Sequence, residues 1–169
     1  MENKDQEKLV AAFDHMVENV SEAIHEAEEA IGPTVDEMVH NAQVLARELF
    51  ALTQEEAESL GDTLKRDMHK ANTTLNQQGK ELKDWLSFDL TLVEDRFIEM
   101  IGRAADKTWL DFRAFEYEDH QASVYLSGEI CSAGTFCCRN CDNNITLSQT
   151  GQIPRCPVCD QQEFFRVVG

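Results

Sequence analysis

The sequence has few basic residues and no long apolar run. It holds 15 Lys and Arg against 32 Asp and Glu, which gives a formal net charge of -17, and its longest unbroken apolar run is Leu9–Phe13. A membrane-spanning helix needs about 20 apolar residues, and the first residues lack the apolar stretch of a secretory signal. We therefore expect a cytoplasmic protein that does not associate with membranes.

The acidic residues are concentrated before residue 121. Residues 1–120 carry 28 of the 32, whereas residues 121–169 carry only 4, together with 3 of the 15 basic residues. Nucleic-acid binders neutralise phosphates with clustered Lys and Arg, so this charge disfavours DNA or RNA as a partner. A protein partner of unknown identity, and a basic one in particular, fits the charge better.

Apolar residues in the acidic part recur at steps of three and four, which predicts helices with one buried stripe. Pro33 ends the first helix, and Thr-x-x-Glu capping boxes beginning at Thr34, Thr53 and Thr91 predict the starts of three more. The stripes favour antiparallel packing in a hairpin, a bundle or a coiled coil, which could also join copies of the chain. The predicted stripes are Leu9, Phe13, Met16, Val20, Ile24, Ala27 and Ile31; Val35, Met38, Ala42, Leu45 and Leu49; Leu60, Leu64, Met68, Ala71, Leu75, Leu82 and Leu86; and Phe97, Ile101, Ala104, Thr108, Phe112 and Phe115.

Cysteines are confined to the last quarter of the chain. All six lie between Cys131 and Cys159, and in a reducing cytosol such clustering indicates metal ligands rather than disulfides. Cys138 and Cys141 form one C-x2-C pair, and Cys156 and Cys159 form a second pair after 14 intervening residues. Two tight turns of this kind can direct four thiolates at one metal ion.

The segments around these pairs predict a small β module. From about residue 121 glycines and β-favouring residues replace Glu and Ala, and short strands are expected at 144–149 and 163–168. The fold class is therefore α+β, with an acidic helical domain over residues 1–120 and a four-cysteine zinc ribbon over residues 121–169. Four thiolates leave no position for water, so the expected Zn2+ is structural, and iron is the alternative metal.

Other candidate residues predict no catalysis. Cys131 and Cys137 are expected to pack as small hydrophobes, with a redox role left open. Neither a catalytic triad nor a Gly-rich phosphate loop is present. The remaining charged motifs are assigned to solvated helix faces: the Glu-x-x-His pairs at Glu22 and Glu37, and the run Lys65-Arg66-Asp67.

Two stretches together resemble the YbeL-like family of bacterial zinc-ribbon-containing proteins. The first combines Leu52-Thr-Gln-Glu-Glu56 with Leu64-Lys-Arg-Asp67, and the second runs from Val124-Tyr-Leu-Ser-Gly-Glu129 through both cysteine pairs to Phe164. Where the second turn of the family often ends in glycine, this chain has Asp160, a residue that tolerates left-handed geometry. The resemblance implies zinc binding at the four cysteines and no particular activity.

The sequence therefore predicts a non-enzymatic protein that acts through contacts with other proteins. In this hypothesis the acidic helices bind a partner or a second copy of the chain, and the ribbon adds a rigid recognition surface. The alternative is a ribbon that binds nucleic acid or the transcription or translation machinery, through Arg139, Arg155 and Arg166. A redox or metal-handling enzyme is the third hypothesis.

Overall fold

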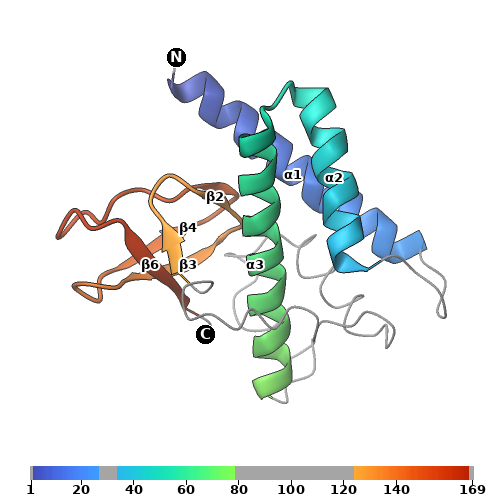
Figure 1. Ribbon diagram of the computed structural model, residues 1–169. Coiled ribbons are helices and arrows are strands. Elements are labelled where there is room, and N and C mark those ends of the chain that lie inside the picture. Colours follow the sequence, from blue (N-terminus) through green and yellow to red (C-terminus); the bar gives the residue numbers. More distant parts are fainter. Residues whose placement is uncertain (1, 27–33, 79–123, 168–169) are drawn as a thin grey trace.

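The structure of the protein is a computed structural model that describes residues 2–26, 34–78 and 124–167 (Figure 1). Three helices come first, and short strands follow, as the sequence predicts. The helices are α1 (Glu2–Glu26), α2 (Val35–Phe50) and α3 (Gln54–Gln78). The strands are β1 (Val124–Leu126), β2 (Ile130–Cys131), β3 (Gly134–Cys138), β4 (Asn144–Leu147), β5 (Gly151–Gln152) and β6 (Glu163–Val167). The predicted helix from Thr91 and the continuation of the third helix past residue 78 lie outside the described residues.

Capping boxes set the starts of α2 and α3. The Glu37 carboxylate accepts from the Thr34 amide at 2.8 Å, and the Thr34 hydroxyl accepts from the Glu37 amide at 3.2 Å. Thr53 and Glu56 make the same two hydrogen bonds at 2.8 and 3.1 Å. Each box satisfies backbone donors that the first turn of a helix otherwise leaves unpaired, so both predicted helix starts are confirmed.

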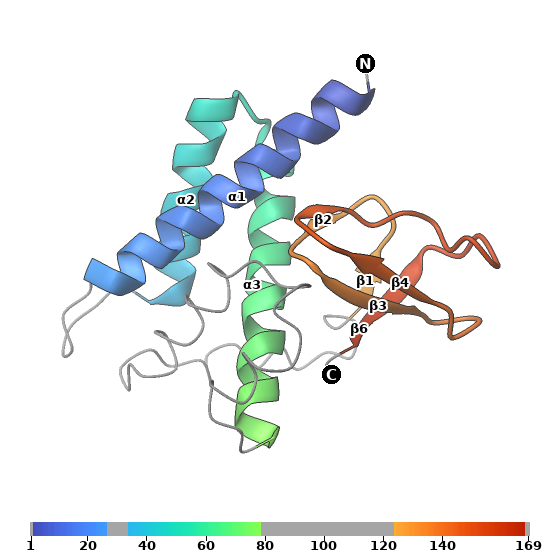
Figure 2. The ribbon, with the colours of Figure 1, turned by 180° about the vertical axis from the view of Figure 1, so that it is seen from behind.

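The three helices share one apolar core, and α1 lies across α2 and α3 when the molecule is seen from behind (Figure 2). Most of the predicted stripe residues that the structure describes are buried. The fully or almost fully buried ones are Phe13, Met16, Val20, Val35, Met38, Ala42, Leu60, Leu64 and Met68.

The second half of the α2 stripe was predicted wrongly. Leu45 is 48% exposed and Leu49 is 64% exposed, whereas Val39 and Ala46 are buried in their place. A straight α-helix drifts by about 20° per heptad relative to a repeat of 3.5 residues, which brings Leu45 to the edge of the buried face. Leu49 keeps the angular position of the buried residues but lies in the last turn of α2, which ends at Phe50.

The strands form an antiparallel sheet in the order β1-β6-β3-β4, with β2 and β5 paired beside it. Side chains alternate between the two sheet faces. Tyr125, Phe136 and Phe164 point to the inner face and are fully buried, while Phe165 and Val167 on the outer face are 38% and 42% exposed. The strands predicted at 144–149 and 163–168 are confirmed as β4 and β6.

The β module lies beside α3, on the side away from α2 (Figure 1). Its β2 strand contacts both α1 and α3, and Ile130 of that strand belongs to the helical core. The predicted domain boundary near residue 120 lies outside the described residues, and the division at that point stays a prediction. Within the described residues, no helix combines the length and apolar character that crossing a membrane requires.

Candidate metal centre and its connection to the helices

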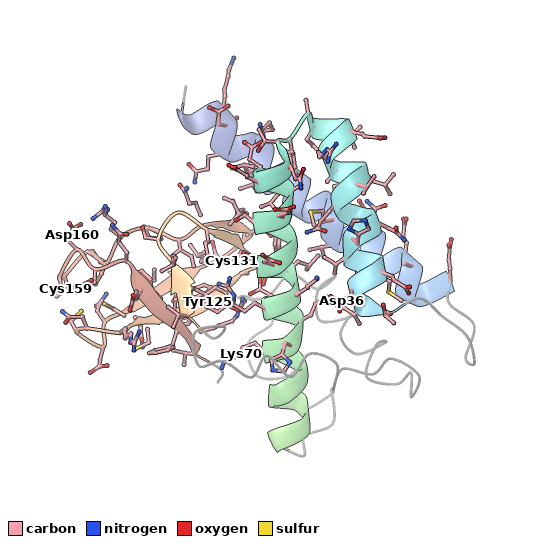
Figure 3. The ribbon with its side chains drawn as sticks, viewed as in Figure 1. Asp36, Lys70, Tyr125, Cys131, Cys159 and Asp160 are labelled. Atoms are coloured by element: carbon pink, nitrogen blue, oxygen red, sulfur yellow. The ribbon has the colours of Figure 1, made fainter. Side chains whose placement is uncertain are left out.

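The four predicted metal ligands come together at one end of the β module. Cys138 ends β3 and Cys141 lies in the turn that follows, while Cys156 and Cys159 lie in the turn before β6. Their four sulfur atoms all lie within 4.8 Å of one another. Cys159 lies at the end of the β module farthest from α3 (Figure 3).

The two cysteine turns have the same backbone hydrogen bonds. In each turn the amide of the first cysteine donates to the carbonyl five residues later, at 2.8 and 3.0 Å. The amide of the residue after the second cysteine donates back to the carbonyl of the first, at 3.0 and 2.9 Å. Those residues are Asp142 and Asp160, with φ values of 56° and 59°. The left-handed geometry expected at Asp160 is thus confirmed, and its counterpart Asp142 was not predicted.

Backbone amides favour the charged form of the sulfurs. The amide of Gln161 lowers the pKa of Cys159 to about 6, because a donor directed at a thiolate stabilises its negative charge. At Cys141 the amide of Asn143 acts in the same direction, but desolvation and hydrogen bonds with the other thiols raise the pKa to about 12. A bound cation would favour the thiolate at all four positions.

The geometry of the four sulfurs suits a tetrahedral metal ion. Zn–S bonds of about 2.3 Å place the sulfurs of a tetrahedron about 3.8 Å apart. Cys138 Sγ lies 3.5 Å from Cys159 Sγ, and Cys141 Sγ lies 3.5 Å from Cys156 Sγ. The donor set therefore fits a closed structural site of the kind that zinc occupies, and the binding of an ion by these residues stays a prediction.

The two remaining cysteines lie outside this group. Cys131 is buried, and burial raises the pKa of its thiol far above the ordinary value, which keeps it protonated and unreactive. Cys137 projects from β3 on the face opposite to Cys138 and is half-buried, opposite Phe165 of β6.

The prediction that the run Lys65-Arg66-Asp67 is solvated is wrong for Asp67. The Asp67 side chain is fully buried, and it accepts hydrogen bonds from Arg166 Nη1 at 2.6 Å and from the Tyr125 hydroxyl at 2.8 Å. The Ser132 amide and hydroxyl also donate to it, at 2.9 and 2.6 Å. Asp67, Tyr125, Ser132 and Arg166 are called the Asp67 cluster below.

The cluster is a satisfied polar network rather than an isolated buried charge. Arg166 also donates to the carbonyls of Ser132 and Ala133 and lies 5.1 Å from the centre of the Phe136 ring. Burial and the neighbouring Asp67 carboxylate raise the pKa of Tyr125 well above 10, so its hydroxyl remains a donor. A buried carboxylate is tolerated only with this degree of pairing.

Arg66 makes a second link between α3 and the β module. Its guanidinium donates to the Val124 carbonyl at 3.0 Å and to Glu129 at 2.8 Å, and it lies 4.8 Å from the centre of the Tyr125 ring. Glu129 in turn accepts from the Leu126 amide at 3.0 Å, across a turn in which Gly128 has a φ of 101°. The Arg-Asp feature of α3 and the Ser-Gly-Glu feature of the ribbon thus meet in one contact, the Arg66–Glu129 ion pair.

A signal for Asp67 is present in the sequence. It follows Leu60 and Leu64 at steps of seven and three, which places a carboxylate on the buried stripe of α3. The Glu-x-x-His pairs behave as predicted where they are described, since Glu37 caps α2 and His40 is exposed.

Three helices packed against an antiparallel ribbon with a four-cysteine cluster define a zinc-ribbon protein. The family model of the zinc-ribbon containing domain matches residues 22–168, and the chain belongs to this family. Uncharacterized protein YbeL of Escherichia coli strain K12 is 23% identical over 159 residues, which cover 94% of this chain and 96% of the relative. The protein of the same name from Escherichia coli O157:H7 has the same identity and coverage. No solved structure matches the chain.

Proposed function

We propose that the protein is a non-enzymatic, cytoplasmic zinc-binding adaptor, in which one structural zinc organises the ribbon and the acidic helices contact a protein partner. The observation that carries the proposal is the cluster of four thiols at Cys138, Cys141, Cys156 and Cys159. An ion held by four thiolates has no open position for water or substrate, so its contribution is to the fold rather than to chemistry.

The outer surface of α2 supports a protein partner. Val44, Leu45 and Leu49 are exposed there, by 45%, 48% and 64%, and Glu48 is exposed beside them. These exposed apolar side chains, in a chain with a net charge of -17, suit a partner that carries apolar and basic side chains. A second copy of the chain is the alternative occupant.

The charges of the ribbon weigh against nucleic acid. Each of its three arginines is engaged by a carboxylate: Arg139 by Glu163 at 2.9 Å, Arg155 by Asp160 at 3.3 Å, and Arg166 by buried Asp67 at 2.6 Å. Binding to phosphate would require these pairs to break, in a protein with a net charge of -17.

Elemental analysis of the purified protein tests the metal site. We expect one zinc per chain, loss of zinc in Cys156→Ser, and full zinc content in Cys137→Ser, which removes a neighbouring thiol outside the cluster. An equal loss in both variants, or stoichiometric iron, would contradict the assignment.

Crosslinking in the native cell, followed by capture of the chain, tests the adaptor role. We expect a specific protein partner whose capture falls when Leu45 and Leu49 are replaced by serine, with zinc content unchanged. A chain that light scattering finds monomeric and that captures nothing would refute this part of the proposal. Salt-sensitive binding of DNA or RNA in a gel-shift experiment would favour the nucleic-acid alternative.

A further inference from the structure

The buried charge of α3 depends on the ribbon for its stabilisation. The donors to Asp67 described above belong to Tyr125 in β1, to Ser132 after β2 and to Arg166 in β6. The carboxylate belongs to helix α3, and the ribbon provides the hydrogen-bond donors that take the place of the water molecules around an exposed carboxylate. Asp67 is therefore stable in its buried position only while these strands hold their arrangement.

The arrangement of those strands is tied to the cysteine site. Arg166 of β6 is paired with Phe136 of β3, and two residues earlier Phe164 is paired with Cys138, the first cysteine of the cluster. A module as small as residues 124–167 buries too little apolar surface to fold on its own, and metal binding can supply much of its folding energy. Loss of the ion would loosen the same strands that carry the donors.

We propose that the Asp67 cluster is a metal-dependent latch that holds α3 on the ribbon only while the cysteine site is loaded. Without the donors, the Asp67 carboxylate must reach water, and α3 must move away from the ribbon for this to happen. The movement uncovers the helical surface that Ile130 covers in the loaded protein. The latch rests on the zinc binding proposed above, and it makes the contact between α3 and the ribbon depend on whether zinc is bound.

Hydrogen exchange of the full-length chain, followed by mass spectrometry under reducing conditions, tests the latch. We compare the zinc-loaded protein with protein treated with a zinc chelator. Removal of zinc is expected to accelerate exchange at least tenfold in peptides covering residues 60–70. Peptides covering α2, which packs mainly against α1 and α3, should accelerate much less.

Two variants separate the latch from a general effect of charge. Asp67→Asn removes the carboxylate that pairs with Arg166 and leaves that guanidinium without its counter-charge. We therefore expect α3 to exchange quickly even with zinc bound, and chelation to add little. Asp62→Asn removes an exposed carboxylate five residues earlier on the same helix and should behave like the natural chain. If Asp67→Asn does not fold, Tyr125→Phe removes one donor and is expected to give an intermediate response.

The outcomes separate the latch from the metal site. A protein that binds zinc but whose α3 exchange is unaffected by chelation overturns the latch and leaves zinc binding intact. Equal acceleration in α2 and α3 indicates general unfolding and also overturns it. A purified protein without zinc refutes the metal site, and the latch with it.

Discussion

At the scale of single residues, the guanidinium of Arg166 lies so close to Gly134 that there is no room for a side chain at that position. A Cβ added at Gly134 would stand 2.5 Å from Nη2 of Arg166, and hydrogen bonds to Asp67 and Ser132 hold the guanidinium in place. We expect Gly134→Ala to lower the free energy of unfolding of the zinc-loaded protein by about 1–3 kcal/mol, as overpacking typically does. Urea unfolding measures this.

Gly151→Ala is the matched control for that substitution. Its added Cβ would meet its nearest neighbour, the Gln149 carbonyl oxygen, at 3.7 Å, which is an ordinary contact. The expected change is within about 0.5 kcal/mol. Equal destabilisation by the two variants would show that Arg166 is free to move away and that its position is not constrained.

The difference between predicted and unpredicted site residues also belongs to this scale. The four clustered cysteines follow from spacing within 22 residues of chain, since two C-x2-C turns are local motifs. Asp67 is paired with residues 58, 65 and 99 positions away, and no local pattern connects them. Because the chain has 32 Asp and Glu residues, the sequence gives little reason to distinguish Asp67 from the acidic residues on the solvated helix faces.

At the scale of elements, α2 presents two kinds of apolar residue that the sequence does not distinguish. Met38 is 2% exposed and Leu49 is 64% exposed. Met38→Ala should therefore lower the free energy of unfolding by about 2–5 kcal/mol, whereas Leu49→Ala should change it by less than about 0.5 kcal/mol. Denaturant unfolding of both variants checks this, and a large loss in Leu49→Ala would mean that the predicted stripe is buried after all.

The start of α2 gives a second prediction for an element. Thr34→Ala removes the hydroxyl that accepts from the Glu37 amide and should cost about 1 kcal/mol of stability. Thr34→Ser keeps a capping hydroxyl and should remain close to the natural chain. Thermal unfolding followed by circular dichroism distinguishes the two variants, and equal melting temperatures would argue that the cap contributes nothing.

At the scale of the whole molecule, the helices and the ribbon should unfold together. Ile130 lies in the helical core, and Asp67 is hydrogen-bonded by residues of the ribbon, so each part loses stabilising contacts when the other unfolds on heating. In cobalt-substituted protein, helix content by circular dichroism and cobalt–thiolate absorbance should give the same melting midpoint. Two separate midpoints would show that the halves are independent domains.

The overall architecture was largely predictable, because helix periodicity, capping boxes and metal spacing are local signals. The packing of the halves was not. It depends on contacts between residues far apart in the chain, namely Ile130 in the helical core, the Asp67 cluster and the pair of Arg66 with Glu129.

The separation of Asp67 from Arg166 has a consequence for synthesis of the chain. The two residues are 99 positions apart, so at 5–20 residues per second the ribosome adds the arginine about 5–20 s after the aspartate. During that interval α3 can form and pack with α1 and α2, but its carboxylate has no arginine to meet and stays in water. Until the ribbon has been synthesised, the surface of the helices that Ile130 covers in the complete protein therefore stays exposed to water.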